Sequence, residues 1–255
     1  MKQNLEIIRQ LTYTDFKLRY SGSVLGYLWS FLKPLGLFLV LYIVFAQMLR
    51  FGDSVPNFPM YLLIGIVLWN FFVEVTTNGL HSIVQRSSLI KKIYFPRIII
   101  VLVSSFSALI NLSFNVMVLI ILMIIFKIDV FHLKTLLAPL YIIELWVLGF
   151  SLALILSSLY VRYRDISYIW ELFLQIFFYA TPIIYPFSMI TSPYDKYLMI
   201  NPIAQIITDF RLIFITFDYP TLPYYPWLHL FGIFLILILG LVIFQRSQRS
   251  FAEQL

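Results

Sequence analysis

The sequence predicts an all-α polytopic membrane protein whose 255 residues form a single transmembrane domain, 1–255. Hydrophobic residues make up 61% of the chain and charged residues only 12%, whereas a soluble domain carries about 25% charged residues. Apolar runs of the length that a helix needs to cross a bilayer, about 20 residues, recur along the chain. The chain has no cysteine, which excludes thiol chemistry, disulfides and thiolate metal sites.

The first element that we expect is an N-terminal interfacial helix within residues 1–27. Leu5, Ile8, Leu11 and Phe16 form its apolar face, and an ordinary cytoplasmic tail is the alternative. Six transmembrane helices follow, each long enough to cross about 30 Å of hydrocarbon. They are predicted at 28–49, 59–79, 98–126, 136–160, 167–187 and 227–245.

The distribution of basic residues sets the orientation, because Lys and Arg near span ends mark the cytoplasmic side. With both termini cytoplasmic, only five of the 18 Lys and Arg residues fall outside, which leaves 18 − 5 = 13 inside. The five are Arg50, Lys127, Lys134, Lys196 and Arg211. We therefore expect both termini to be cytoplasmic, and we attribute the net charge of +6 to topology rather than to nucleic-acid binding.

Two segments between spans contain features that a simple connecting loop would not need. Residues 81–97 hold four basic residues and no acidic one, yet they also contain Leu89, Ile90 and Phe95, which a plain loop does not require. Residues 186–226 form an outer region in which Asn201-Pro202 predicts a helix start, an N-cap followed by proline at the first helical position. The apolar stretch that follows is too short to span, so we expect re-entrant outer helices between spans five and six.

Motifs for enzymatic chemistry are missing from the sequence. None of the nine glycines is followed by lysine, so there is no Walker A loop, and HExxH and GxSxG are absent too. His81, His132 and His229 fall near predicted span ends, where hydrogen bonding is a better explanation than catalysis. We therefore predict no catalytic and no metal-binding residues in this chain. Glu74, Glu144 and Glu171 are the acidic residues that an ion-coupled carrier would use, but no span carries a proton-relay chain.

Aromatic residues form two helical stripes. A sugar ring has apolar C–H faces, on which flat aromatic rings stack, and hydroxyls, which polar groups bind. One interpretation of the stripes is therefore a translocation path for a glycan. The other is helix packing or an aromatic belt at the membrane interface. The stripes are Phe31, Phe38, Tyr42 and Phe45 in the first span, and Trp170, Phe173 and Phe177 in the fifth, beside Gln175.

Two polar features leave alternatives open. One face of the third span is polar and contains Ser104, Ser107, Asn111 and Asn115. These residues either form hydrogen bonds between helices or line a polar transport path. Arg162, Arg164 and Asp165 in the inner loop between spans four and five form either a local ion pair or topology charges.

Taken together, these features resemble the membrane-spanning subunit of ABC-2 type polysaccharide exporters, a group that includes O-antigen, capsule and teichoic acid export permeases. The best markers are LIKKIYFPR at 89–97, RYRDI at 162–166 and Asn201-Pro202. The similarity covers essentially the whole chain.

The resemblance implies a homodimer that pairs with two copies of a separate P-loop ABC ATPase, which binds ATP and Mg, so this chain itself needs no cofactor and is not an enzyme. It places a coupling helix for the ATPase on 81–97, the aromatic stripes along a channel, and Asn201 and Pro202 at an outer gate. The coupling residues would be Arg86, Leu89, Ile90, Lys91, Lys92, Phe95, Pro96 and Arg97.

The implied function is ATP-driven export of a lipid-linked, O-antigen-like polysaccharide across the cytoplasmic membrane of a bacterium or archaeon. Exporters of teichoic acid, small lipids or drugs in the same group are the nearer alternatives. An integral-membrane transferase acting on glycans or lipids is a more distant one, and so is a single-chain secondary carrier, which normally shows an internal repeat.

Overall fold

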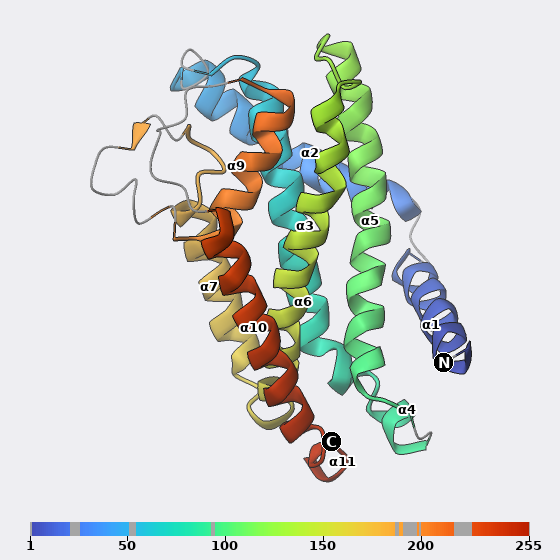
Figure 1. Cartoon of the computed structure of the whole chain (residues 1–255). Coiled ribbons are helices and arrows are strands. Elements are labelled where there is room, and N and C mark those ends of the chain that lie inside the picture. Colours follow the sequence, from blue (N-terminus) through green and yellow to red (C-terminus); the bar gives the residue numbers. More distant parts are fainter. Residues whose placement is uncertain are drawn as a thin grey trace.

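The computed structural model describes residues 2–20, 26–50, 55–92, 95–186, 189–190, 198, 200–216 and 226–254. Within these residues the regular structure is helical throughout, and the helices stand side by side in a bundle (Figure 1). Its elements are α1 (Lys2–Tyr20), η1 (Gly26–Leu28), α2 (Trp29–Leu41), η2 (Tyr42–Met48), α3 (Phe58–Gln85), α4 (Ser87–Lys92), α5 (Ile98–Ile125), η4 (Leu133–Leu137), α6 (Ala138–Arg162), α7 (Ile166–Ala180), α9 (Pro202–Phe214), α10 (Pro226–Ser247) and α11 (Phe251–Gln254).

Five helical segments in the described part of the chain are long and apolar enough to cross a membrane. They are Trp29–Met48, Phe58–Gln85, Ile98–Ile125, Leu133–Arg162 and His229–Ser247, which match five of the six predicted spans. The remaining prediction, 167–187, corresponds to α7, which is apolar but only 15 residues long. At 1.5 Å per residue α7 reaches roughly 22 Å, and the chain leaves the helix at Thr181, so the sixth full span is not found.

Helix α3 is the centre of the bundle, packed between α5 and α6, with α10 on the far side of α6 (Figure 1). It is buried on almost all sides: in its most apolar stretch of 18 residues, 78% of the residues lie inside the molecule. Small residues let the helices approach closely: a Cβ at Gly79 of α3 would overlap Ala153 of α6, and one at Gly240 of α10 would meet the Ser151 carbonyl oxygen of α6 at 2.7 Å.

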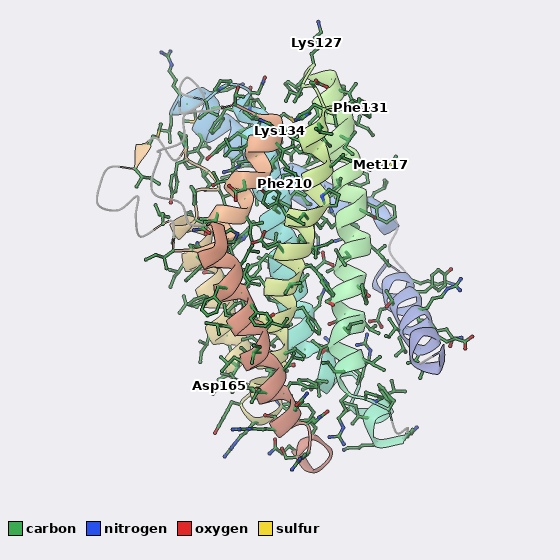
Figure 2. All side chains as sticks on the ribbon, viewed as in Figure 1. Met117, Lys127, Phe131, Lys134, Asp165 and Phe210 are labelled. Atoms are coloured by element: carbon green, nitrogen blue, oxygen red, sulfur yellow. The ribbon has the colours of Figure 1, made fainter. Side chains whose placement is uncertain are left out.

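The two ends of the bundle differ in the way that the basic residues predict. Both termini and α4 lie at one end in Figure 1, and Asp165, in the α6–α7 connection, lies at that end in Figure 2. Lys127 and Lys134 lie at the opposite end (Figure 2). The described chain therefore has both termini on one side of the bundle; that this side is cytoplasmic stays a prediction.

The boundaries differ from the predicted ones in the segment 81–97. Helix α3 continues to Gln85, so the first part of this segment belongs to the long helix and only α4 is a separate short helix. Residues 93–94 lie outside the described residues, and Pro96 then separates α4 from α5, because proline disfavours a helical conformation in the residue before it.

Helix α9 lies in the outer region and begins where the sequence predicts. Asn201 is its N-cap, and its Oδ1 accepts a hydrogen bond from the backbone N–H of Ile203 at 3.0 Å. The helix packs against α3, α6 and α10 and buries Gln205, Thr208 and Arg211 as well as its apolar residues. It is therefore enclosed by the bundle rather than lying with one face on the membrane surface.

Candidate functional site

A groove of about 870 Å³ runs along α7, from Ser167 near its start to Tyr179 near its end. Its opposite wall is α3, and α2 contributes Leu37 and α6 contributes Tyr160. Aromatic and polar side chains alternate in its lining. Among the described residues that line it, none is lysine or arginine, and Glu171 is the single carboxylate. The groove can therefore bind hydroxyls and stack on apolar ring faces, but it offers no fixed positive charge to an anion.

The α3 wall of the groove contains a polar stripe that the sequence analysis missed. Asn70, Thr77 and His81 line the groove, and Glu74 lies between them at helical spacing. The imidazole of His81 is oriented by a bond of 2.9 Å between its Nδ1 and the Thr77 carbonyl oxygen, and its ring meets the Tyr160 ring edge-on at 4.9 Å. A search for polar residues at spacings of three and four, which reveals a stripe in the third span, would also have revealed this one, spaced four, three and four.

The fifth-span aromatic residues form a continuous stack. Trp170 and Phe173 stack with ring centroids 5.5 Å apart, and Phe173 and Phe177 stack at 4.1 Å. Trp170 lines the groove but is anchored to the bundle, because its Nε1 donates to the Thr76 hydroxyl at 3.2 Å. Gln175 also lines the groove and is exposed. The structure thus brings Trp170 and Gln175 together at the groove, with Phe173 exposed beside them.

The first-span aromatic residues are placed differently. Phe38 and Tyr42 stack at 5.7 Å, and together with Phe45 they pack against the chain's own hydrophobic core. Phe31 is half-buried. None of these four residues lines the groove, where α2 is represented by Leu37. Phe38, Tyr42 and Phe45 thus serve packing within this chain, and a role of the stripe in a translocation path stays a prediction.

One face of α7 is polar and uncovered. Tyr168 and Tyr179 are 73% and 69% exposed, and Glu171 and Gln175 between them are exposed as well. Glu171 lies in the second turn of α7, and lipid is a poor neighbour for a carboxylate or an amide. This face therefore requires protein or water against it.

The region predicted to couple to an ATPase is held together by contacts inside the chain. Arg86 forms an ion pair with Asp15 of α1, and its Nη1 donates to the Ile100 carbonyl oxygen of α5 at 3.4 Å. Burial lowers the pKa of the Arg86 guanidinium from its ordinary value. Arg86 therefore joins α1, the end of α3 and the start of α5.

Ile90 is 9% exposed and belongs to a cluster with Ile83, Ile100 and the fully buried Phe251 of α11. Phe95 packs against the same cluster. Ile90 is therefore buried within this chain and Phe95 partly so, and their part in ATPase coupling stays a prediction. The sequence analysis missed Phe251, whose signal is a lone aromatic residue after the polar run 245–250.

The remaining coupling candidates form the outer surface of this end. Lys91, Lys92 and Pro96 are exposed, and Leu89 is half-buried. Arg97 is half-buried, with its Cζ 6.0 Å from the centroid of the Phe251 ring. The exposed cations of α4 are thus fixed on a rigid base.

The other polar candidates have structural partners. The guanidinium groups of Arg162 and Arg164 lie over the rings of Tyr163 and Tyr160, at 5.2 and 5.1 Å, rather than on Asp165. In the third-span stripe, Ser104 and Ser107 are buried and bond to carbonyls of their own helix. Asn115 also bonds its own helix, and Asn111 reaches another one, with its Nδ2 donating to Glu74 Oε2 of α3 at 2.6 Å. That stripe therefore packs inside the bundle.

The two remaining histidines join elements at the outer end. His132 bonds the Ile213 carbonyl oxygen of α9 through Nε2 at 2.6 Å. His229 Nε2 of α10 lies 2.7 Å from Glu144 Oε1 of α6, with both side chains more than nine-tenths buried. Glu144 is thereby accounted for as one half of a buried pair between two helices.

Asn201 and Arg211 of α9 hold the outer end of α7. The Asn201 Nδ2 donates to the Thr181 hydroxyl at 3.0 Å. Arg211 is 0% exposed and donates to the carbonyl oxygens of Pro182 and Ile183, at 2.6 and 2.9 Å. Helix α9 is thus tied at two points to the turn in which α7 ends.

Sequence comparison places this geometry in a known class. Residues 6–215 match the ABC-2 type transporter family, which is more than half of the chain, so the chain belongs to the ABC-2 transporter membrane family. It is 31% identical to an O-antigen export system permease protein RfbA of Klebsiella pneumoniae over 99% of this chain and 98% of that protein. It is 29% identical to the protein of the same name of Myxococcus xanthus, over 98% of this chain and 95% of that protein. The sequence prediction of an ABC-2 membrane subunit is confirmed.

Proposed function

We propose that this chain is the permease subunit of an ATP-driven exporter that moves a lipid-linked, O-antigen-like polysaccharide across the cytoplasmic membrane. The observation that carries the proposal is the groove along the 15 residues of α7, whose lining combines aromatic rings, among them Trp69, Trp170 and Phe178, with hydroxyl-binding groups. Weak stacking and hydrogen bonding suit a polymer that slides, because passage requires binding that is loose enough to release. The O-antigen permease relatives support the same substrate class.

The polar face of α7 supports a homodimer. Glu171 and Gln175 cannot face lipid without cost, and a second copy placed against α7 would enclose the groove as an aromatic-lined, water-filled channel. The two grooves of such a dimer would then form opposite walls of a single path for the glycan.

Energy enters from separate subunits in this proposal. Two copies of a P-loop ABC ATPase bind ATP and Mg and contact the end of the bundle where Lys91 and Lys92 are exposed. The burial of Ile90 of α4 in one cluster with Ile83 of α3 and Ile100 of α5 supports this role, because a docking element must be anchored to the helices that it moves.

The charge of the groove favours a polysaccharide over the nearest alternative, teichoic acid. Teichoic acids are polyanions, and Lys and Arg are the usual side chains for phosphate. The described lining of the groove contains neither and includes a carboxylate. Export of small lipids or drugs is the other near alternative, and a membrane transferase is the more distant one.

A test uses two exposed neighbours on α7. Gln175 lines the groove, whereas Ile176 is 57% exposed and does not. In cells that depend on this permease, Gln175→Ala should lower surface glycan by about twofold to tenfold, the loss expected for one hydrogen bond. Ile176→Ala, at matched protein level, should leave it unchanged. Equal surface glycan in both variants, or normal export in cells without the chain, would contradict the proposal.

A further inference from the structure

A second pocket lies on the other side of the α3 wall, between α2, α3 and α5. It has a volume of about 720 Å³, and we refer to it as the side pocket. Trp29 and Lys33 come from α2, Glu74 and Asn78 from α3, and Asn111 from α5. Leu37, Asn70, Val73 and Thr77 line both the side pocket and the groove, so the two spaces share one wall.

The polar groups of the side pocket are unusual for the middle of membrane-spanning helices. The Glu74 carboxylate is oriented by Asn111, whose Nδ2 donates to Oε2 at 2.6 Å. The Nδ2 of Asn78 is buried and has no hydrogen-bond partner among the residues that the structure describes. A buried donor without a partner costs about 1–3 kcal/mol, so an acceptor brought into the pocket and bonded to this amide would stabilise the site.

We propose that the side pocket is a second saccharide-binding site, which holds one sugar unit of the glycan while the rest occupies the groove. A sugar hydroxyl both donates and accepts, so one ring satisfies the Asn78 amide and bonds the Glu74 carboxylate. The Trp29 indole, 42% exposed, offers a flat surface for the C–H face of the ring. This inference rests on the proposed function and names the chemistry of its substrate.

The charges of the side pocket specify an uncharged sugar. Lys33 and Glu74 are its lysine and its carboxylate, and the other polar groups in its described lining are amides and hydroxyls. Their formal charges cancel, so the pocket offers no net attraction to a uronic acid or a phosphate. A hydroxyl-rich neutral hexose matches this set of donors and acceptors.

The experiment captures the glycan where it binds, in cells that express the complete transporter. The photoreactive residue p-benzoylphenylalanine replaces Trp29 in the side pocket, Tyr168 in the groove, or Met117, which lies on an exposed face of α5 (Figure 2). After illumination, the protein is examined for covalently attached glycan. Attachment is expected at Trp29 and Tyr168 and absent at Met117. Adding Asn78→Leu should lower attachment at Trp29 by about fivefold and leave Tyr168 unchanged, because one hydrogen bond is lost in the side pocket only.

The outcomes separate this inference from the proposed function. Attachment at Tyr168 without attachment at Trp29 overturns the side pocket as a sugar site and leaves the groove. Attachment at neither position overturns both. Equal attachment at Trp29 and Met117 shows collision with the membrane surface and also overturns the side pocket. The Tyr168 signal in the Asn78→Leu protein verifies that this variant is folded and active. Composition analysis of the captured unit must show an uncharged sugar, and an anionic one would refute the charge argument.

Discussion

Arg211 and Gly65 offer a decisive test of how the outer end of this protein is held together. The Arg211 side chain is fully buried, and its Nε, Nη1 and Nη2 donate to the carbonyl oxygens of Tyr61, Pro182 and Ile183. Its Cζ lies 3.6 Å from the centroid of the Tyr61 ring. A Cβ at Gly65 would overlap Nη2 and approach Cζ to 3.1 Å, so Gly65→Ala pushes on a group that three hydrogen bonds fix in place.

The size of the effect follows from these contacts. A displaced guanidinium loses at least one charge-assisted hydrogen bond, worth about 1.5–3 kcal/mol. Overpacking of the site adds about 1–3 kcal/mol. Against this, alanine gains about 1 kcal/mol over glycine in a helix interior. We therefore expect Gly65→Ala to destabilise the protein by about 2–5 kcal/mol.

The assay is thermal unfolding of the purified protein in detergent, with Gly232→Ala as the matched control. A Cβ at Gly232, also inside a long helix, meets nothing within 4 Å. With about 2–4 °C for each kcal/mol, Gly65→Ala should lower the Tm by roughly 5–15 °C, and Gly232→Ala should leave it level or raise it slightly.

A double variant isolates the contact. Arg211→Met removes the guanidinium that a Cβ at position 65 would overlap. The loss of Tm caused by Gly65→Ala should therefore largely vanish in the Arg211→Met background. Additive costs, or equal Tm values for Gly65→Ala and Gly232→Ala, would refute the role assigned to this contact.

Three further predictions concern other parts of the chain. Reversing Lys91 and Lys92 to Glu should leave membrane insertion intact, because both are exposed, and should reduce the amount of co-purified ATPase by about tenfold; unchanged co-purification and stimulated ATPase activity would contradict the docking surface. Phe173→Ala removes two stacking partners at a cost of about 1–3 kcal/mol, so surface glycan should fall more than protein level in immunoblots of membranes. Glu144→Leu should lower the Tm more than Glu144→Gln, whose amide oxygen still accepts from His229; equal Tm values would show that this pair contributes nothing.

The sequence predicted the helices correctly where one physical effect outweighs all others. Hydrophobic runs located five long helices, four of them to within three residues at each end, because partition into a bilayer overrides other preferences; α3 runs six residues beyond its predicted end, to Gln85. The start of α9 was equally predictable, since Asn201 followed by Pro202 satisfies and pre-shapes the first turn locally. The length of α7 was overestimated, because 167–187 is predominantly apolar and hydropathy does not reveal that the chain leaves the helix at Thr181.

The site was harder to predict because it depends on which face of each helix meets which neighbour. Stripes on α2 and α7 look alike in sequence, yet Phe38 packs on the core and Gln175 lines the groove. Ile90 has the composition of a docking residue and is instead covered by Phe251, which lies far along the chain. Arg211 was counted as an outer-loop charge, because its partners are backbone carbonyls, which leave no trace in side-chain patterns.

Helix α3 links the three functional regions, and this has a mechanical consequence for the proposed exporter. Its last residues adjoin Arg86, which ties α4 to α1 and α5. Its middle supplies Asn70 and Thr77 to the shared wall between the groove and the side pocket. Its first turns hold Arg211 through Tyr61 and Gly65, and Arg211 in turn holds the end of α7.

A well-packed helix transmits displacement along its axis because protein interiors have low compressibility. An ATPase that displaces α4 would therefore displace the groove wall on α3 and, through Arg211, the end of α7. Both ends of the proposed path would then move together in one conformational change.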